Sequence, residues 1–319
     1  LTPAGMEVYS IGTRLLFSEV DPIMIGSDVE VSVENPNGAI TGKVAIKLDS
    51  TADTWLQMSP WLALPGCHTL HLSATKASKV IWQNRKMMVN REAPAPRLGF
   101  MKIIYHVERT DFALAKSLGA THLYCDEVMN DNGGWKQVPQ YLDAAQANGL
   151  KLFIAASYHA KAAPFAMAEN LTGTKETVPH PALEGWYSQD EAAGTFDRLA
   201  ANYMACRMAS SATSVELDLN NFQRLKEAAQ YCNRLWVNVY LNSTDNRRKI
   251  TDVVKKAAAL QPTVLVLPLY DNMKTSRADL LDMARIGKEA GCVGIAIFEM
   301  ERDGVVWTAD EQETVRQVF

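Results

Sequence analysis

The chain has 319 residues, of which 47% are hydrophobic and 21% charged, and its formal net charge at pH 7 is −4. This composition is typical of globular proteins and not of disordered ones. No cluster of Lys and Arg is present, so no nucleic-acid partner is expected. No apolar stretch approaches the roughly 18 residues that a membrane-spanning helix needs, so no membrane span is expected. The length favours two domains, or one barrel with an additional domain.

Residues 1–93 contain short segments in which apolar and polar residues alternate. The clearest segments are Val29–Val33, Gly42–Leu48 and His68–Leu72. Alternation with a period of two, interrupted by turn residues, predicts an antiparallel β-sandwich over residues 1–93. Pro94 and Pro96 cannot continue a strand ladder, and residues 94–98 are therefore predicted to form a linker.

From residue 99 to residue 319, strand patterns alternate with helix patterns. The predicted strands are Gly99–His106, Thr121–Glu127, Leu150–Ser157, Leu183–Ser188, Ser214–Leu219, Arg234–Leu241, Thr263–Tyr270 and Cys292–Glu299. Helices are predicted between them, for example at Asp111–Leu118, Val138–Asn148, Ala192–Met208, Phe222–Tyr231, Lys249–Leu260 and Ser276–Ala290. Eight strand–helix repeats predict a TIM (β/α)8 barrel. An open doubly wound sheet is the alternative, but the glycine-rich turn expected after its first strand is absent.

Polar and aromatic residues gather where the predicted strands end, which is where TIM barrels carry their active sites. The predicted substrate-binding residues are Asp126, Glu127, His106, His159, Trp186, Asp218, Asn238, Tyr240 and Tyr270. Acids and amides bind hydroxyl groups, and aromatic faces stack on sugar rings, so this mixture suits a carbohydrate substrate. Alternation along the fifth strand directs Glu216 and Asp218 into the barrel. Glu216 is expected to form an ion pair low in the barrel with Lys102.

The segment Leu183-Glu184-Gly185-Trp186-Tyr187-Ser188-Gln189-Asp190-Glu191 resembles the Gly-Trp-Tyr-x-x-Asp-Glu-Pro motif on the fourth strand of many TIM-barrel glycoside hydrolases. The resemblance implies that Glu191 is the general acid/base and that Asp190 lies beside it. Ala192 replaces the Pro of the motif, a change at the first turn of a helix that no chemical step requires. A β-sandwich of the Ig-like type before the barrel is also similar to the layout of several such hydrolases. In a purely structural interpretation, the two acids would only cap the following helix.

Glycosidic cleavage usually needs a second carboxylate. The resemblance places it as a Glu at the end of the seventh strand, but this chain has Asp271 there. Glu299, after the eighth strand, is the preferred candidate because it follows a long apolar run, and Asp271 and Asp218 are the substitutes. No metal is expected, since the His-x-His pair of metal-dependent barrel hydrolases is absent from the first strand.

Two alternatives remain open. The pair Asp190-Glu191 also resembles the β-hexosaminidase type, in which the acetamido group of the substrate is the nucleophile, the Asp orients it and the Glu is the acid. In the other alternative, the barrel has lost catalysis and only binds a glycan or a protein. A carbohydrate is the expected partner, no cofactor is expected, and the oligomeric state stays open. Leu1 in place of Met and the class of substrate favour a secreted or periplasmic location.

Overall fold

The computed structural model describes residues 5–11, 13–35, 37–58, 66–90, 99–125, 137–155, 180–189, 196–209, 213–220, 222–239, 246–269, 275–302 and 305–319. Proximity of Cα atoms divides the chain into two compact units, Leu1–Ala93 and Pro94–Phe319. Among the described helices, none is long and apolar enough to cross a membrane.

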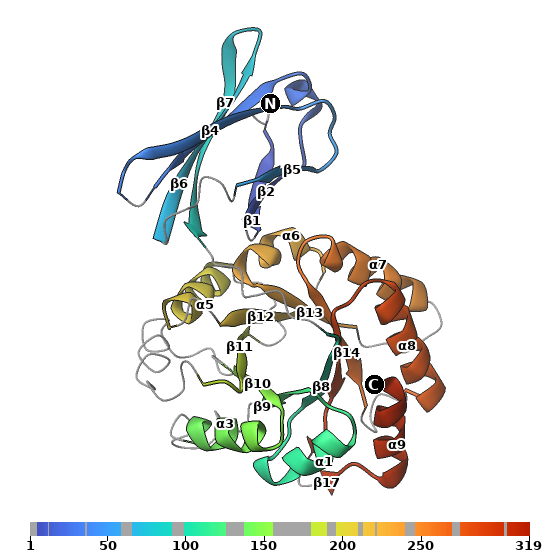
Figure 1. Ribbon diagram of the computed structural model, residues 1–319. Helices are drawn as coiled ribbons and strands as arrows, with labels where there is room; N and C mark the ends of the chain where they lie inside the picture. Colours follow the sequence, from blue (N-terminus) through green and yellow to red (C-terminus); the bar gives the residue numbers. More distant parts are fainter. Residues whose placement is uncertain are drawn as a thin grey trace. The chain divides into compact units, whose positions relative to one another are not determined.

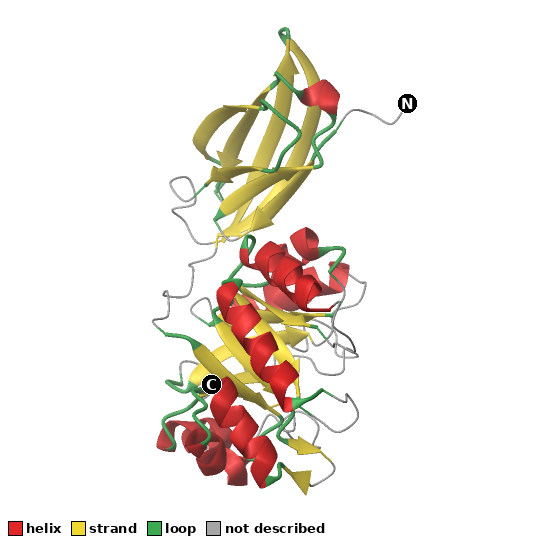
Figure 2. Cartoon of the chain, turned by 90° about the vertical axis from the view of Figure 1, so that its right-hand side faces the viewer, coloured by secondary structure: helices red, strands yellow, loops and turns green. Residues whose placement is uncertain are grey.

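The N-terminal unit consists of two antiparallel sheets, and Figure 2 shows that strands make up nearly all of it. One sheet has the order β1(Glu7–Ile11)-β2(Arg14–Ser18)-β5(Thr54–Gln57), and the other has the order β4(Ile40–Lys47)-β3(Asp28–Glu34)-β6(Gly66–Lys76)-β7(Lys79–Asn90). In β3 the alternating Val29, Val31 and Val33 are fully buried. They share one core cluster with Leu15 and Phe17 from the other sheet. The predicted antiparallel strands are confirmed, while the Ig-like type stays a prediction.

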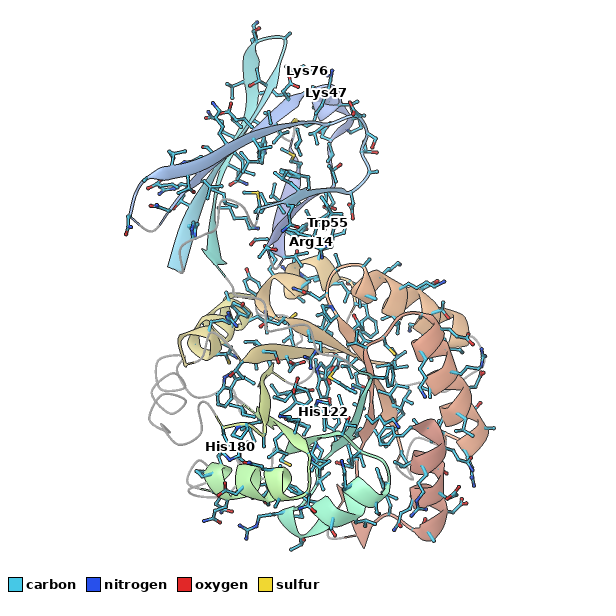
Figure 3. All side chains as sticks on the ribbon, in the orientation of Figure 1. Arg14, Lys47, Trp55, Lys76, His122 and His180 are labelled. Carbon is cyan, nitrogen blue, oxygen red and sulfur yellow. The ribbon has the colours of Figure 1, made fainter. Side chains whose placement is uncertain are left out.

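Arg14 and Trp55 form a side-chain pair on the three-stranded sheet. The guanidinium of Arg14 lies 4.2 Å from the ring centroid of Trp55, and Figure 3 shows the two side by side. Their strands β2 and β5 are neighbours in the sheet. A guanidinium over an indole face is a favourable cation–π contact, so Arg14 covers one face of the Trp55 ring.

The second unit contains a closed barrel of parallel strands (Figure 1). The strands are β8(Met101–Tyr105), β9(His122–Cys125), β10(Lys151–Ala155), β11(Leu183–Gln189), β12(Ser214–Leu219), β13(Arg234–Asn238), β14(Thr263–Pro268) and β15(Gly294–Phe298). They follow one another around the ring in chain order. The predicted eight-stranded barrel is confirmed. The first strand ends one residue earlier than predicted, because His106 has a φ of +51° and leaves the extended conformation.

Helices surround the ring, as Figure 1 shows. They are α1(Phe112–Ser117), α3(Val138–Ala147), α5(Phe196–Ala209), α6(Leu225–Ala228), α7(Asn246–Ala258), α8(Arg277–Glu289) and α9(Ala309–Val318). Gly119, Gly149 and Gly291 follow three of them with φ values of +95°, +62° and +97°. Left-handed glycines of this kind end a helix before the next strand. The short strands β16(Glu301–Arg302) and β17(Val305–Val306) form a separate hairpin.

Four cysteines, Cys125, Cys206, Cys232 and Cys292, are free thiols in buried positions. Burial disfavours the thiolate, and it raises the pKa of Cys292 to about 11. The pKa of Cys206 is raised further by the same cause. At neutral pH these two thiols stay protonated, so they pack as small apolar side chains.

Candidate functional site

The strand register fixes which side chains enter the barrel. Met101, Tyr105, Phe153, Tyr187 and Trp236 belong to one buried interior cluster. Because successive side chains of a strand point to opposite faces, Glu216 and Asp218 lie on the inner side of β12 and the intervening leucine faces the helices. This confirms the predicted inward direction of the two acids.

A network of charged side chains fills the interior near the N-terminal ends of the strands. We call this set, formed by His122, Glu184, Glu216 and Arg234, the floor network. Arg234 Nη2 lies 3.4 Å from Glu184 Oε1, and Arg234 Nη1 lies 3.5 Å from Glu216 Oε1. His122 Nε2 lies 3.4 Å from Glu184 Oε2, and Figure 3 shows the ring of His122 within the barrel.

Two neutral side chains also donate hydrogen bonds to the carboxylate of Glu216. Ser214 Oγ donates to Glu216 Oε1 over 2.6 Å, and Trp236 Nε1 donates to Oε2 over 2.7 Å. The side chains of Glu184 and Glu216 are fully buried, and buried charges of this kind require partners. The expected ion pair of Glu216 exists, but its partner is Arg234. The prediction of Lys102 was wrong, because Lys102 alternates with the inward residues Met101 and Ile103.

An irregularity in β11 brings Glu184 into the floor network. The pairing with β10 shifts between Leu152↔Leu183 and Phe153↔Gly185, so β11 has one more residue there than β10. Strict alternation would place Glu184 on the same face of β11 as Trp186. Trp186 pairs with Ile154, and both side chains face the helices. A β-bulge re-aims a side chain in this way. The bulge explains why a charged residue within an apolar strand is buried and paired.

The glycine of the Gly-Trp-Tyr segment has a steric role beside the floor network. A Cβ atom at Gly185 would lie 2.6 Å from Ser214 Oγ and 2.9 Å from Glu216 Oε1. Gly185→Ala is therefore expected to lower the free energy of unfolding by about 1–3 kcal/mol, the usual cost of overpacking a core. Chemical denaturation of the full chain measures this loss.

Ser214→Ala provides the matched background for that test, because it removes the nearest clashing atom. The loss caused by Gly185→Ala should be smaller in the Ser214→Ala background than in the wild type. Equal losses in both backgrounds would show that the clash with Ser214 is not the reason for glycine at this position.

Aromatic side chains close the barrel above the floor network. We call the set of Tyr105, Tyr124, Tyr187, Asp218 and Trp236 the tyrosine layer. Tyr187 Oη donates to Asp218 Oδ2 over 2.8 Å, and Tyr105 Oη lies 3.4 Å from the same oxygen and 3.0 Å from Tyr187 Oη. The rings contact one another with centroid separations of 4.2 Å for Tyr124–Tyr187 and 5.1 Å for Tyr187–Trp236. These side chains fill the barrel interior next to the floor network.

One of the predicted site residues, Asp218, belongs to the tyrosine layer. Asp218 is 1% exposed, and its carboxylate accepts hydrogen bonds from two phenols. Its carboxylate is therefore held within the tyrosine layer, and the predicted substrate contact of Asp218 stays a prediction. The sequence prediction left out Tyr105 and Tyr187. Alternation along the first and fourth strands would have indicated that both side chains point into the barrel.

Trp186 does not fit its predicted role. Its side chain is fully buried, and its ladder partners are Ile154 and Val215. Both partners alternate with inward residues, so Trp186 packs on the helix-facing side of β11. A ring in this position is not accessible for stacking on a sugar.

Three predicted residues lie at the C-terminal side of the barrel in the described part of the chain. Asn238 ends β13 at an inward position and is 4% exposed. His106 follows β8, and Glu299 follows β15. His106 Nδ1 lies 3.8 Å from Glu299 Oε2, and the two side chains are 15% and 11% exposed. The structure thus brings a carboxylate and an imidazole together at the end of the barrel where catalysis was expected.

The remaining predicted site residues fall outside the described residues. They are Asp126, Glu127, His159, Asp190, Glu191, Tyr240, Tyr270 and Asp271. Among the described residues, no three His, Cys, Asp or Glu side chains gather as a metal site.

No protein-family model matches the chain, and no curated protein does so either. Among solved structures, the chain is similar to an FMN-binding β-glucuronidase from Facaelibacterium prausnitzii L2-6, with a TM-score of 0.47, 11% identity and coverage of 95% of this chain and 57% of that one. It is also similar to a β-D-glucuronidase from Dictyoglomus thermophilum, with a TM-score of 0.45, 12% identity and coverage of 95% and 62%. A third is a β-glucuronidase from Ruminococcus gnavus, with a TM-score of 0.47, 10% identity and coverage of 99% and 68%. The chain spans less than two thirds of the length of the first two proteins.

Proposed function

We propose that the chain is a glycoside hydrolase in which Glu191 is the general acid/base and Glu299 is the second carboxylate. The observation that carries the proposal is the position of Glu299, a carboxylate only 11% exposed, after the C-terminal end of β15 in a closed parallel barrel. Catalytic groups of TIM barrels come from the C-terminal ends of different strands.

The strand order supports this pairing of carboxylates. In the ring β8 to β15, β11 and β15 are separated by four steps in either direction and are therefore opposite one another. Glu191 comes two residues after the end of β11 at Gln189. An eight-stranded barrel is just wide enough for side chains to fill its interior. Two carboxylates from opposite strands suit a mechanism in which acids flank the scissile bond on its two faces.

The proposed reaction breaks the bond between the anomeric carbon and the glycosidic oxygen. Glu191 gives its proton to the departing oxygen, while the Glu299 carboxylate acts on the opposite face of the sugar. If the two carboxyl groups are about 5–5.5 Å apart, Glu299 attacks the anomeric carbon and a water molecule later releases the sugar with retention. If they are about 6.5–9.5 Å apart, Glu299 accepts a proton from a water molecule that attacks directly, with inversion. In both cases one water molecule is consumed for each bond cleaved.

A panel of natural oligosaccharides and chromogenic glycosides tests the proposal with the full chain. The expected result is cleavage of at least one glycan by the wild type, detected as new reducing ends or released chromophore. Binding of glycans without cleavage of any would overturn the proposal in favour of the non-catalytic barrel. Cleavage confined to substrates with an acetamido group, and unaffected by Glu299→Gln, would favour the substrate-assisted mechanism.

A further inference from the structure

The backbone of His106 is in a conformation that L residues seldom adopt. Its φ is +51°, in the left-handed region that normally suits glycine and, less often, Asn, Asp or His. The amide of His106 still donates to the carbonyl of Tyr124 over 3.0 Å, so the residue is tied to the neighbouring strand β9. Strained residues of this kind persist where their surroundings over-determine them, and they cluster at functional sites.

The aromatic rings around His106 fix the direction of its imidazole. The ring stacks on Tyr105 with a centroid separation of 6.0 Å and an interplanar angle of 18°. Phe298 and Tyr124 meet it edge-on, at 5.2 Å and 6.1 Å. Two of these rings come from the barrel interior and the third precedes Glu299 in the chain. The imidazole is therefore held from several sides, in an orientation that turns Nδ1 to Glu299.

The distance between the two side chains suits an ion pair. Nδ1 of His106 lies 3.8 Å from Glu299 Oε2, and both side chains are largely buried. Among the described residues, the phenols of Tyr105 and Tyr124 also lie beside the imidazole, and Asp218 is one hydrogen bond further away through Tyr105. An opposite charge within about 4–6 Å favours the charged forms of both partners.

We propose that His106 is a positioning residue for Glu299, which it orients and keeps ionised, and not a contact for the substrate. This inference rests on the proposed function for its catalytic consequence, but the ion pair itself can be tested without a substrate. An ionised Glu299 is needed both as a nucleophile and as a base. The left-handed backbone of His106 holds its imidazole beside the carboxylate of Glu299 before any substrate binds.

The ion pair is tested by NMR titration of the histidines in the full chain. The signal of His106 is assigned by its absence from the spectrum of His106→Asn, in which the new residue tolerates the left-handed backbone. In Glu299→Gln the titration midpoint of His106 is expected to move to lower pH by about one unit, because an opposite charge is removed. An unchanged midpoint would overturn the proposal, whatever activity the chain has.

The catalytic consequence is tested with the best glycoside from the panel. His106→Asn and His106→Phe, which both lack the charge, should lower kcat more than they raise KM. Both should also move the acid limb of the kcat/KM profile to higher pH, because loss of the neighbouring cation raises the pKa of Glu299 and the carboxylate is then protonated at higher pH. A rise of KM at every pH with an unmoved limb would make His106 a substrate contact and overturn the inference. Failure of the wild type on every glycan would remove the proposed function, while the NMR result would still decide the ion pair.

Discussion

Glu191→Gln is expected to lower kcat/KM for a natural glycan by about 10²–10⁴-fold, the usual contribution of a general acid. Glutamine keeps the size and polarity of the side chain but has no proton to give to the leaving oxygen. The loss should be much smaller for aryl glycosides whose leaving group is a stable phenolate, since such a group departs without protonation. Steady-state kinetics with a natural and an activated substrate measure both effects.

Asp190→Asn is the matched control for this substitution. It changes the neighbouring acid in the same way, but in the two-carboxylate mechanism Asp190 transfers no proton. Its effect should be less than that of Glu191→Gln and independent of the leaving group. If Asp190→Asn abolishes cleavage as fully as Glu191→Gln, and only substrates with an acetamido group are cleaved, the substrate-assisted mechanism replaces the proposed one.

Arg234→Met is expected to lower the free energy of unfolding of the barrel by about 3–5 kcal/mol, the cost of breaking a buried ion pair by removing one partner. Arg234 lies 3.4 Å and 3.5 Å from the carboxylates of Glu184 and Glu216, whose side chains are fully buried. The substitution removes a cation from two buried acids, of which Glu184 keeps His122 as a neighbour at 3.4 Å. Urea denaturation followed by tryptophan fluorescence measures the loss, and Trp236 reports directly because it donates to Glu216.

Arg285→Met provides the control on the surface. Arg285 pairs with Asp282 and Glu289 on α8, and its own side chain is 57% exposed. Ion pairs in such positions contribute about 0–1 kcal/mol. Similar small losses for both substitutions would contradict the view that the floor network is a buried and tightly coupled element of the barrel.

Most of the barrel could be predicted from the alternation of residues and from a few helix ends. Strand β12 matched its predicted bounds because Glu216 and Asp218 interrupt an apolar run with a period of two. The glycines at 119 and 149 ended their helices as expected, since both have positive φ. Helix α9 was not among the predicted helices, although Thr308 and Glu311 form a capping box at its start.

The partners within the barrel could not be predicted, because they depend on the stagger between strands. Glu216 and Arg234 are direct neighbours in the β12–β13 ladder, and this register is not visible in either segment alone. The bulge that turns Glu184 inward is likewise a property of the pairing between β10 and β11. Lys102 was chosen by charge, without knowledge of the face on which it lies.

The depth of a residue in the barrel was the second quantity that sequence could not supply. Asp218 and Trp186 lie on strands with the expected pattern, but Asp218 is buried and hydrogen-bonded to Tyr187 and Tyr105, and Trp186 is buried on the side that faces the helices. Glu299 was chosen because an acid after a long apolar run has little local reason to be there. It lies at the C-terminal side of the barrel beside His106.

In the proposed reaction, a proton from Glu191 and the carboxylate of Glu299 together cleave a glycosidic bond. The most direct test counts new reducing ends over time for the wild type, Glu191→Gln and Glu299→Gln on one glycan that all three proteins bind. We expect steady cleavage by the wild type and a loss of about 10²-fold or more in each variant, with binding retained. Equal rates for the three proteins, or binding by the wild type with no reducing ends formed, would contradict it.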